Sequence, residues 1–85
     1  MSTKPDYAFY RPIADAIILA RNNALPKITQ KQLAKRAGFS RALVANIELG
    51  RQQILVHVLV RIAKALNVSL KELLKNIKLK PGRKV

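Results

Sequence analysis

The stretch TQKQLAKRAGFSRALVANIELGR, residues 29–51, decides the fold of this chain. Thr29 is followed three residues later by Gln32, and this spacing is that of a capping box, in which two side chains satisfy backbone N–H groups at a helix start. Gly38 supplies the positive φ that a tight turn needs. The sequence therefore predicts a helix over residues 30–37 and a turn directly after it.

A second helix follows this turn. Ser40 is a residue type that caps helices, because its hydroxyl oxygen accepts a hydrogen bond from a free backbone N–H. Gly50 then stops the helix, which gives a predicted range from Arg41 to about Leu49. A short helix, a turn and a second helix at this spacing form the arrangement that places a recognition helix in the major groove of DNA.

The sequence on either side of this pair predicts three more helices. Pro12 suits the first position of a helix, where its missing N–H is not needed. Apolar residues fill more than one narrow stripe between Leu55 and Leu66, which predicts a helix central to the core. Ser69 and Glu72 have the spacing of a second capping box. The predicted ranges are about 12–23, 55–66 and 70–77.

The charge of the chain calls for a polyanionic partner. Seventeen Lys and Arg residues face four acidic residues, a net charge of +13, and Glu48 is the only acidic residue between Asp15 and Glu72. Nucleic acid is the first candidate, because neutralising its phosphates releases condensed counterions. Anionic lipid and an acidic protein are the alternatives.

Length and composition limit the architecture. Eighty-five residues hold one modest core, and only 5% of them are aromatic. The chain has no cysteine, which removes disulfides and thiolate metal sites and favours a reducing cytoplasm. We expect an all-α, compact five-helix bundle at residues 12–76, an N-terminal extension at residues 1–11 and a disordered basic C-terminal tail at residues 77–85. No segment is expected to enter a membrane.

Residues 29–51, together with RIAKALNVSLKELL at residues 61–74, resemble the Cro/phage-repressor (XRE-type) helix-turn-helix family. The resemblance covers roughly residues 13–75. It implies the lambda-repressor-like DNA-binding fold and a sequence-specific transcriptional regulator in the cytoplasm, associated with the nucleoid through its DNA. The expected protein is a repressor or autoregulator that binds a palindromic operator on double-stranded DNA as a homodimer.

The resemblance also implies which residues meet DNA. Arg41 and Asn46 are expected to read bases, because a guanidinium pairs with guanine O6 and N7 and an amide pairs with adenine N6 and N7. Gln30 is expected to meet a phosphate at a helix N-terminus. The base-contacting set is Ser40, Arg41, Ala42, Ala45 and Asn46, and the phosphate-contacting set is Gln30, Lys31, Lys35 and Arg51.

Two structural roles follow from the same resemblance. An ion pair is expected between Arg21 and Glu48. The segment Ile54-Leu55-Val56 stands where the family usually has a proline and a polar cap, so Leu55 and Val58 are expected to form a homodimer contact. The alternative is that these two side chains belong to a deeper core or to ordinary exposed surface.

Catalysis, metal binding and a cofactor are not expected. The four carboxylates are scattered along the sequence, His57 is the only histidine, and no glycine-rich phosphate loop is present. The sequence is also compatible with two other functions. One is an antitoxin that binds a partner protein such as a toxin through the Leu55 and Val58 surface, and the other is a sequence-nonspecific basic protein that coats DNA.

Overall fold

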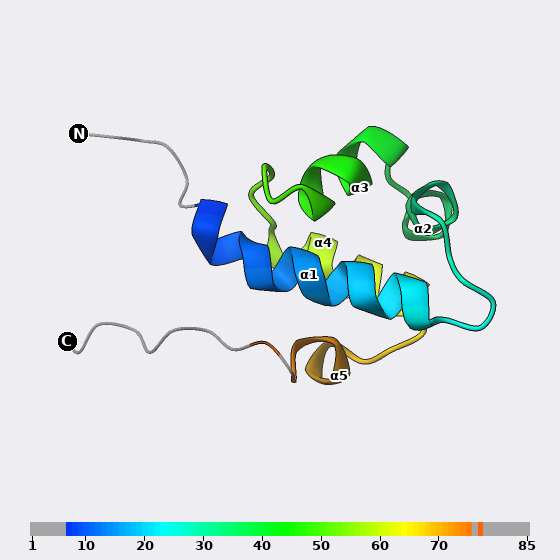
Figure 1. Ribbon diagram of the computed structural model, residues 1–85. Helices are drawn as coiled ribbons and strands as arrows, with labels where there is room; N and C mark the ends of the chain where they lie inside the picture. Colours follow the sequence, from blue (N-terminus) through cyan, green and yellow to red (C-terminus); the bar gives the residue numbers. More distant parts are fainter. Residues whose placement is uncertain (1–6, 76, 78–85) are drawn as a thin grey trace, which may run out of the picture.

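The computed structural model describes residues 7–75 and residue 77, and this part of the chain forms five α-helices and no strand (Figure 1). The helices are α1 (Tyr7–Asn23), α2 (Gln30–Ala37), α3 (Arg41–Glu48), α4 (Val56–Ala65) and α5 (Leu70–Leu74). The predicted all-α, five-helix class is confirmed. Residues 1–6, which begin the expected N-terminal extension, and residues 78–85 of the expected basic tail lie outside the described residues.

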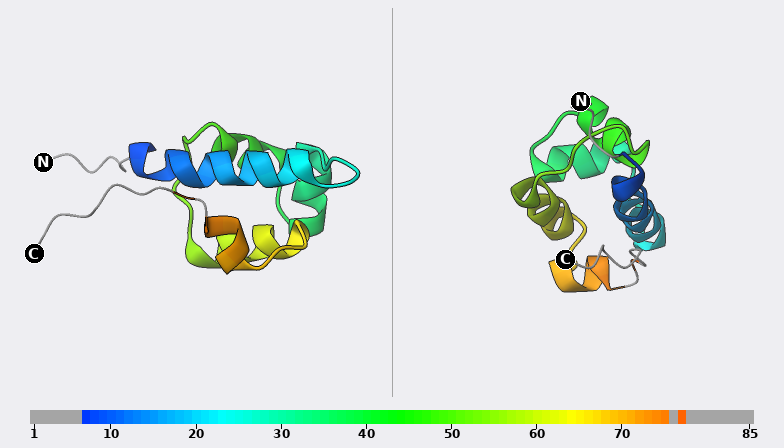
Figure 2. Two further views of the ribbon diagram at one scale, coloured as in Figure 1. Left: turned by 60° about the horizontal axis from the view of Figure 1, so that its bottom comes forward. Right: turned by 90° about the vertical axis from the view of Figure 1, so that its left-hand side faces the viewer.

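The five helices close a ring around one core. α3 packs on α1 and α2, α4 packs on α2 and α5, and α5 returns to α1. Figure 2 shows this ring from the end, with α1 and α4 on opposite sides of the core. Each helix therefore has two neighbours, and α3 is held from both sides.

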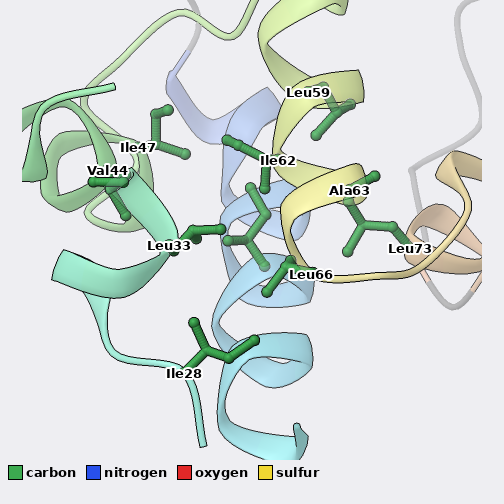
Figure 3. Packing of buried hydrophobic residues seen from close by; sticks show 11 residues of the cluster. Ile28, Leu33, Val44, Ile47, Leu59, Ile62, Ala63, Leu66 and Leu73 are labelled. Atoms are coloured by element: carbon green, nitrogen blue, oxygen red, sulfur yellow. The ribbon is translucent and has the colours of Figure 1, made fainter. Parts of the chain in front are cut away.

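The core consists of aliphatic side chains that come from every helix (Figure 3). Ile17, Leu33 and Ile62 are completely buried at its centre. Leu73 extends the cluster to α5. Burying side chains of this size contributes roughly 1.5 to 3 kcal/mol each, and the chain has neither disulfides nor a large aromatic core to add to this.

The helix starts are capped as the sequence predicts. The Gln32 N–H donates to Thr29 Oγ1 at 3.1 Å and the Thr29 N–H donates to Gln32 Oε1 at 2.9 Å, which completes the capping box of α2. Ser40 Oγ accepts from the Leu43 N–H at 3.0 Å and caps α3. Ser69 accepts from the Glu72 N–H at 2.9 Å, which is one half of the second predicted box.

Glycine ends both helices of the central pair. Gly38 after α2 has a φ of 80° and Gly50 after α3 has a φ of 72°. In both turns, the N–H groups of the glycine and of the next residue bond to carbonyls three and five residues earlier, which is the Schellman pattern. The positive φ of each glycine sets the direction in which the chain leaves the helix, and at Gly38 this contributes to the angle between α2 and α3.

The predicted start of the first helix at Pro12 is wrong. α1 begins at Tyr7, and Pro12 lies inside it. The extra turn is stabilised at Arg11, whose guanidinium pairs with Asp15 one turn later and reaches the end of α3. These contacts offset the backbone hydrogen bond that proline removes. α5 is also shorter than predicted, because it ends at Leu74.

Replacing Leu33 by alanine tests the core. Leu33 is fully buried, whereas Leu25 in the loop after α1 is 98% exposed, so Leu25→Ala is a control with the same chemical change. We expect Leu33→Ala to lower the free energy of unfolding by about 2 to 5 kcal/mol, and Leu25→Ala to change it by less than about 0.5 kcal/mol. Urea unfolding followed by circular dichroism measures both, and equal losses would contradict the packing described.

Candidate nucleic-acid interface

A buried carboxylate at the end of α3 organises the site. Glu48 is only 6% exposed. Arg21 on α1 donates to both of its oxygens, from Nε to Oε2 at 2.8 Å and from Nη2 to Oε1 at 2.9 Å. Gln30 on α2 donates from Nε2 to Oε1 at 2.9 Å. The expected ion pair is therefore present, in the bidentate form that is strongest for arginine, and it joins three helices.

Arg11 holds the same end of α3 from outside. Its Nη2 donates to the backbone carbonyl of Glu48 at 2.7 Å, and it forms an exposed ion pair with Asp15 at 2.9 Å. A cation at this point satisfies one of the carbonyls left free at a helix C-terminus and interacts favourably with the helix dipole. Two arginines of α1 thus hold the end of α3. Arg21 binds the side chain of Glu48, and Arg11 binds its backbone carbonyl.

These contacts leave one side of α3 exposed. Val44, Ile47 and Glu48 are buried, and Ala45 is half-buried. Arg41, Ala42 and Asn46 are exposed, and Ser40 is exposed at the N-terminus, where its oxygen caps the helix. The five residues predicted to contact bases therefore lie at the start of α3 and along its less buried side.

The residues predicted to contact phosphates lie on α2 and just after α3. Lys31, Lys35 and Arg51 are exposed. Gln30 is half-buried, because one of its amide N–H groups is used by Glu48. A side-chain amide has two N–H donors, so the second one and the backbone N–H at the start of α2 can still meet an anion.

The two residues predicted to form a dimer contact have different surroundings. Leu55 is 53% exposed and precedes α4, whereas Val58 is half-buried and packs against the core. The exposed apolar side chains in this region are Leu55, Val56 and Val60. We call these three residues the α4 apolar surface; Val56 and Val60 were not predicted, because the register of α4 decides which valines face outward.

Two arginines make contacts that the sequence did not predict. Arg11 contacts α3, and Arg61 of α4 stacks on Phe39 in the turn, with its guanidinium carbon 4.5 Å from the ring centroid. The spacing of Arg11 and Asp15 is a signal for an i,i+4 pair. Nothing in the sequence signals the Arg61 contact, because its partner lies on another helix.

Within residues 7–75 and residue 77, no three residues of the types that bind metal ions come together. No helix in this described part is long and apolar enough to cross a membrane.

Comparison with known proteins identifies the architecture. The family model described as Helix-turn-helix (HTH_3) matches residues 18–73, which is more than half of the chain. No sequence among the curated proteins matches the chain.

Several solved structures share the fold. The restriction-modification controller protein C.AhdI from Aeromonas hydrophila superposes with a TM-score of 0.72 at 24% identity, over 79% of this chain and 94% of that one. The hypothetical transcription factor NHTF from Neisseria gives 0.71 at 28% identity, over 87% and 84%. An HTH_3 family transcriptional regulator from Vibrio cholerae gives 0.74 at 25% identity, over 85% of this chain and 39% of that longer one.

Removing the buried carboxylate tests its role. We expect Glu48→Ala to lower the free energy of unfolding by about 3 to 5 kcal/mol, because Arg21 would keep its hydrogen bond to the Ile28 carbonyl but would hold a largely buried charge without a counter-ion. Asp15→Ala breaks the exposed pair with Arg11 and is the control, with an expected loss of about 1 kcal/mol or less. Urea unfolding of these variants, of Arg21→Ala and of the double variant Arg21→Ala/Glu48→Ala completes a double-mutant cycle. Additive effects of Arg21→Ala and Glu48→Ala would contradict the pairing.

Proposed function

The chain belongs to the Helix-turn-helix (HTH_3) family, and from this membership we propose that it is a sequence-specific DNA-binding transcriptional regulator. The exposed side of α3 is the observation that carries the proposal. Arg41, Ala42 and Asn46 lie there on a helix whose other side is fixed by the core and by Glu48. Two structures with the same fold are described as a transcriptional regulator and a hypothetical transcription factor, which supports this role.

The chemistry of this face suits the major groove. Arg41 presents a guanidinium and Asn46 presents an amide, the two groups that pair with guanine and adenine edges respectively. Ala42 and Ala45 are small enough for the helix backbone to approach the bases, and their methyl groups suit contact with a thymine methyl. α3 has one carboxylate, Glu48, and its burial keeps negative charge away from the phosphates.

Backbone contacts would then orient the protein on the duplex. Lys31 and Lys35 on α2 and Arg51 after α3 are exposed on the elements that flank the recognition face. Gln30 is the first residue of α2, so its backbone N–H and the second N–H of its side-chain amide are available to bind a phosphate. These groups supply affinity and register without reading sequence.

We further propose that the regulator acts as a homodimer on a palindromic operator, as a repressor or autoregulator. The α4 apolar surface supports a dimer, because Leu55, Val56 and Val60 are exposed close together in the sequence. Two copies related by a two-fold axis would place their α3 helices in successive major grooves about 34 to 36 Å apart. A domain that occupies a promoter in this way can block access of polymerase to it.

Substitution of the two base-reading residues tests sequence recognition. We expect Arg41→Ala and Asn46→Ala each to reduce the preference for the DNA upstream of the gene, over a scrambled duplex of equal length, by about 1 to 3 kcal/mol. This is roughly a fivefold to 150-fold change. Fluorescence anisotropy at several salt concentrations measures the preference.

Two further variants serve as controls for this experiment. Arg51→Ala should weaken binding to both duplexes alike, because a phosphate contact carries no sequence information. Lys71 is exposed on α5. Lys71→Ala should leave the sequence preference unchanged, and it should lower the affinity for both duplexes only by the small effect of removing one positive charge. Equal, salt-sensitive binding of both duplexes by every variant would favour the DNA-coating function, which the net charge of +13 supports.

A charge placed on the α4 apolar surface tests the dimer. We expect Leu55→Asp to weaken self-association at least tenfold, because a carboxylate would have to be desolvated in the interface. Leu25→Asp, at a loop position that is 98% exposed, is the matched control and should leave association unchanged. Sedimentation velocity over a concentration series measures this, and unchanged association of Leu55→Asp would place the dimer contact elsewhere.

A further inference from the structure

A second group of cations lies away from the exposed side of α3, on the seam between α2 and α4. An open cavity of about 540 Å³ is present there. Figure 2 shows α2 and α4 next to each other on this side of the ring. The residues that line the cavity are small or cationic: Lys35, Arg36, Ala37, Gly38, Arg61, Lys64 and Ala65.

The charge of this cavity is unbalanced. Four of the seven lining residues are cations and none is acidic. The ion pairs found among the described residues use Arg11 and Arg21, so they do not neutralise the cavity. Lys35, Arg36 and Lys64 lie in the last turns of their helices, where the dipole favours a cation. Arg61 lies in the middle of α4, so the dipole of that helix does not explain why a cation stands at this position.

Arg61 is also held in place. Its guanidinium stacks on the Phe39 ring, and it lies so close to Gly38 that a side chain at position 38 would collide with Nη2. Stacking uses the flat face of a guanidinium and leaves the N–H groups at its edge able to donate. Stacking on Phe39 therefore favours one position of the guanidinium before any anion arrives, and a pre-positioned donor loses less entropy on binding.

We propose that this α2–α4 cavity binds phosphates of the DNA backbone that flanks the operator. The inference rests on the proposed function, and it adds a second contact to the same duplex. Lys35 is shared between the cavity and the residues assigned to the operator backbone, and Gly38, which lines the cavity, lies in the turn that leads to α3. The cavity has no large apolar side chain apart from the cation stems, and a protein partner would need such an anchor.

Duplex length and charge removal test the proposal together. The cavity variant is Arg36→Gln with Lys64→Gln, which removes two cations but leaves Arg61 on Phe39. The matched control is Lys71→Gln with Lys75→Gln, which removes two exposed cations from the region of α5. Each protein is titrated with a short operator duplex and with one extended by roughly one helical turn, about 10 base pairs, at each end. Thermal unfolding verifies that all variants are folded.

We expect the extended duplex to bind severalfold more tightly to the wild type and to the control, but not to the cavity variant. For the extended duplex, the slope of the logarithm of the binding constant against the logarithm of the salt concentration should be smaller in magnitude by about two in the cavity variant. Each lost phosphate contact reduces this slope by about one. Preference for the operator over a scrambled short duplex should be the same in all three proteins. Loss of that preference in the wild type would refute the proposed function, whereas its retention without a length effect would refute only the cavity proposal.

A second measurement distinguishes DNA from two other possible ligands of the cavity, a small anion and an acidic protein. Inorganic phosphate and poly-glutamate are added to each protein without DNA, and chemical shifts of the Arg61 and Lys64 amides are followed. Saturable binding of phosphate alone, with no length effect, would overturn the proposal in favour of a small anion. Binding of poly-glutamate that only the cavity variant loses, again with no length effect, would overturn it in favour of an acidic protein.

Discussion

The fold depends on the burial of one negative charge, the Glu48 carboxylate. It accepts hydrogen bonds from Arg21 on α1 and Gln30 on α2, while its own backbone carbonyl accepts one from Arg11. A buried ion pair contributes little net stability compared with apolar side chains, but it is costly to break, because the remaining charge stays desolvated. Its value here is geometric, since one carboxylate sets the positions of three helices and orients the exposed side of α3.

The same burial shapes the electrostatics of the surface. Glu48 is paired inside the molecule and Asp15 is paired with Arg11, so little acidic charge is left to offset the exposed lysines and arginines. A surface with this imbalance attracts polyanions over a distance of about 8 to 10 Å at ordinary salt concentrations. Such a field attracts DNA but does not select a sequence, so in the proposed function selection is left to the few side chains on α3.

Local signals in the sequence were sufficient for α2, the turn and α3. Thr29, Ser40 and Gly38 act on atoms within a few residues, so their roles follow from spacing alone. Contacts between helices were not predictable from such signals. The stacking of Arg61 on Phe39 depends on how α4 crosses the turn, and the inward position of Val58 depends on the register of α4. Only the Arg21–Glu48 contact was anticipated, because a family resemblance carries long-range information that spacing does not.

The small number of base-reading groups has a consequence for assembly. In the proposed function, one α3 offers Arg41 and Asn46 as its two main polar readers, and each would contribute about 1 to 3 kcal/mol of discrimination, or about 2 to 6 kcal/mol for one copy. A specific regulator needs about 4 to 10 kcal/mol over nonspecific DNA. Ala42 and Ala45 add shape but no hydrogen bond. A single copy therefore reaches only the lower part of the range that is needed, whereas two copies on a symmetric operator reach all of it. For the proposed function, this sparse reading surface would therefore require two copies, and the exposed Leu55 and Val56 offer the surface on which we propose that the two copies meet.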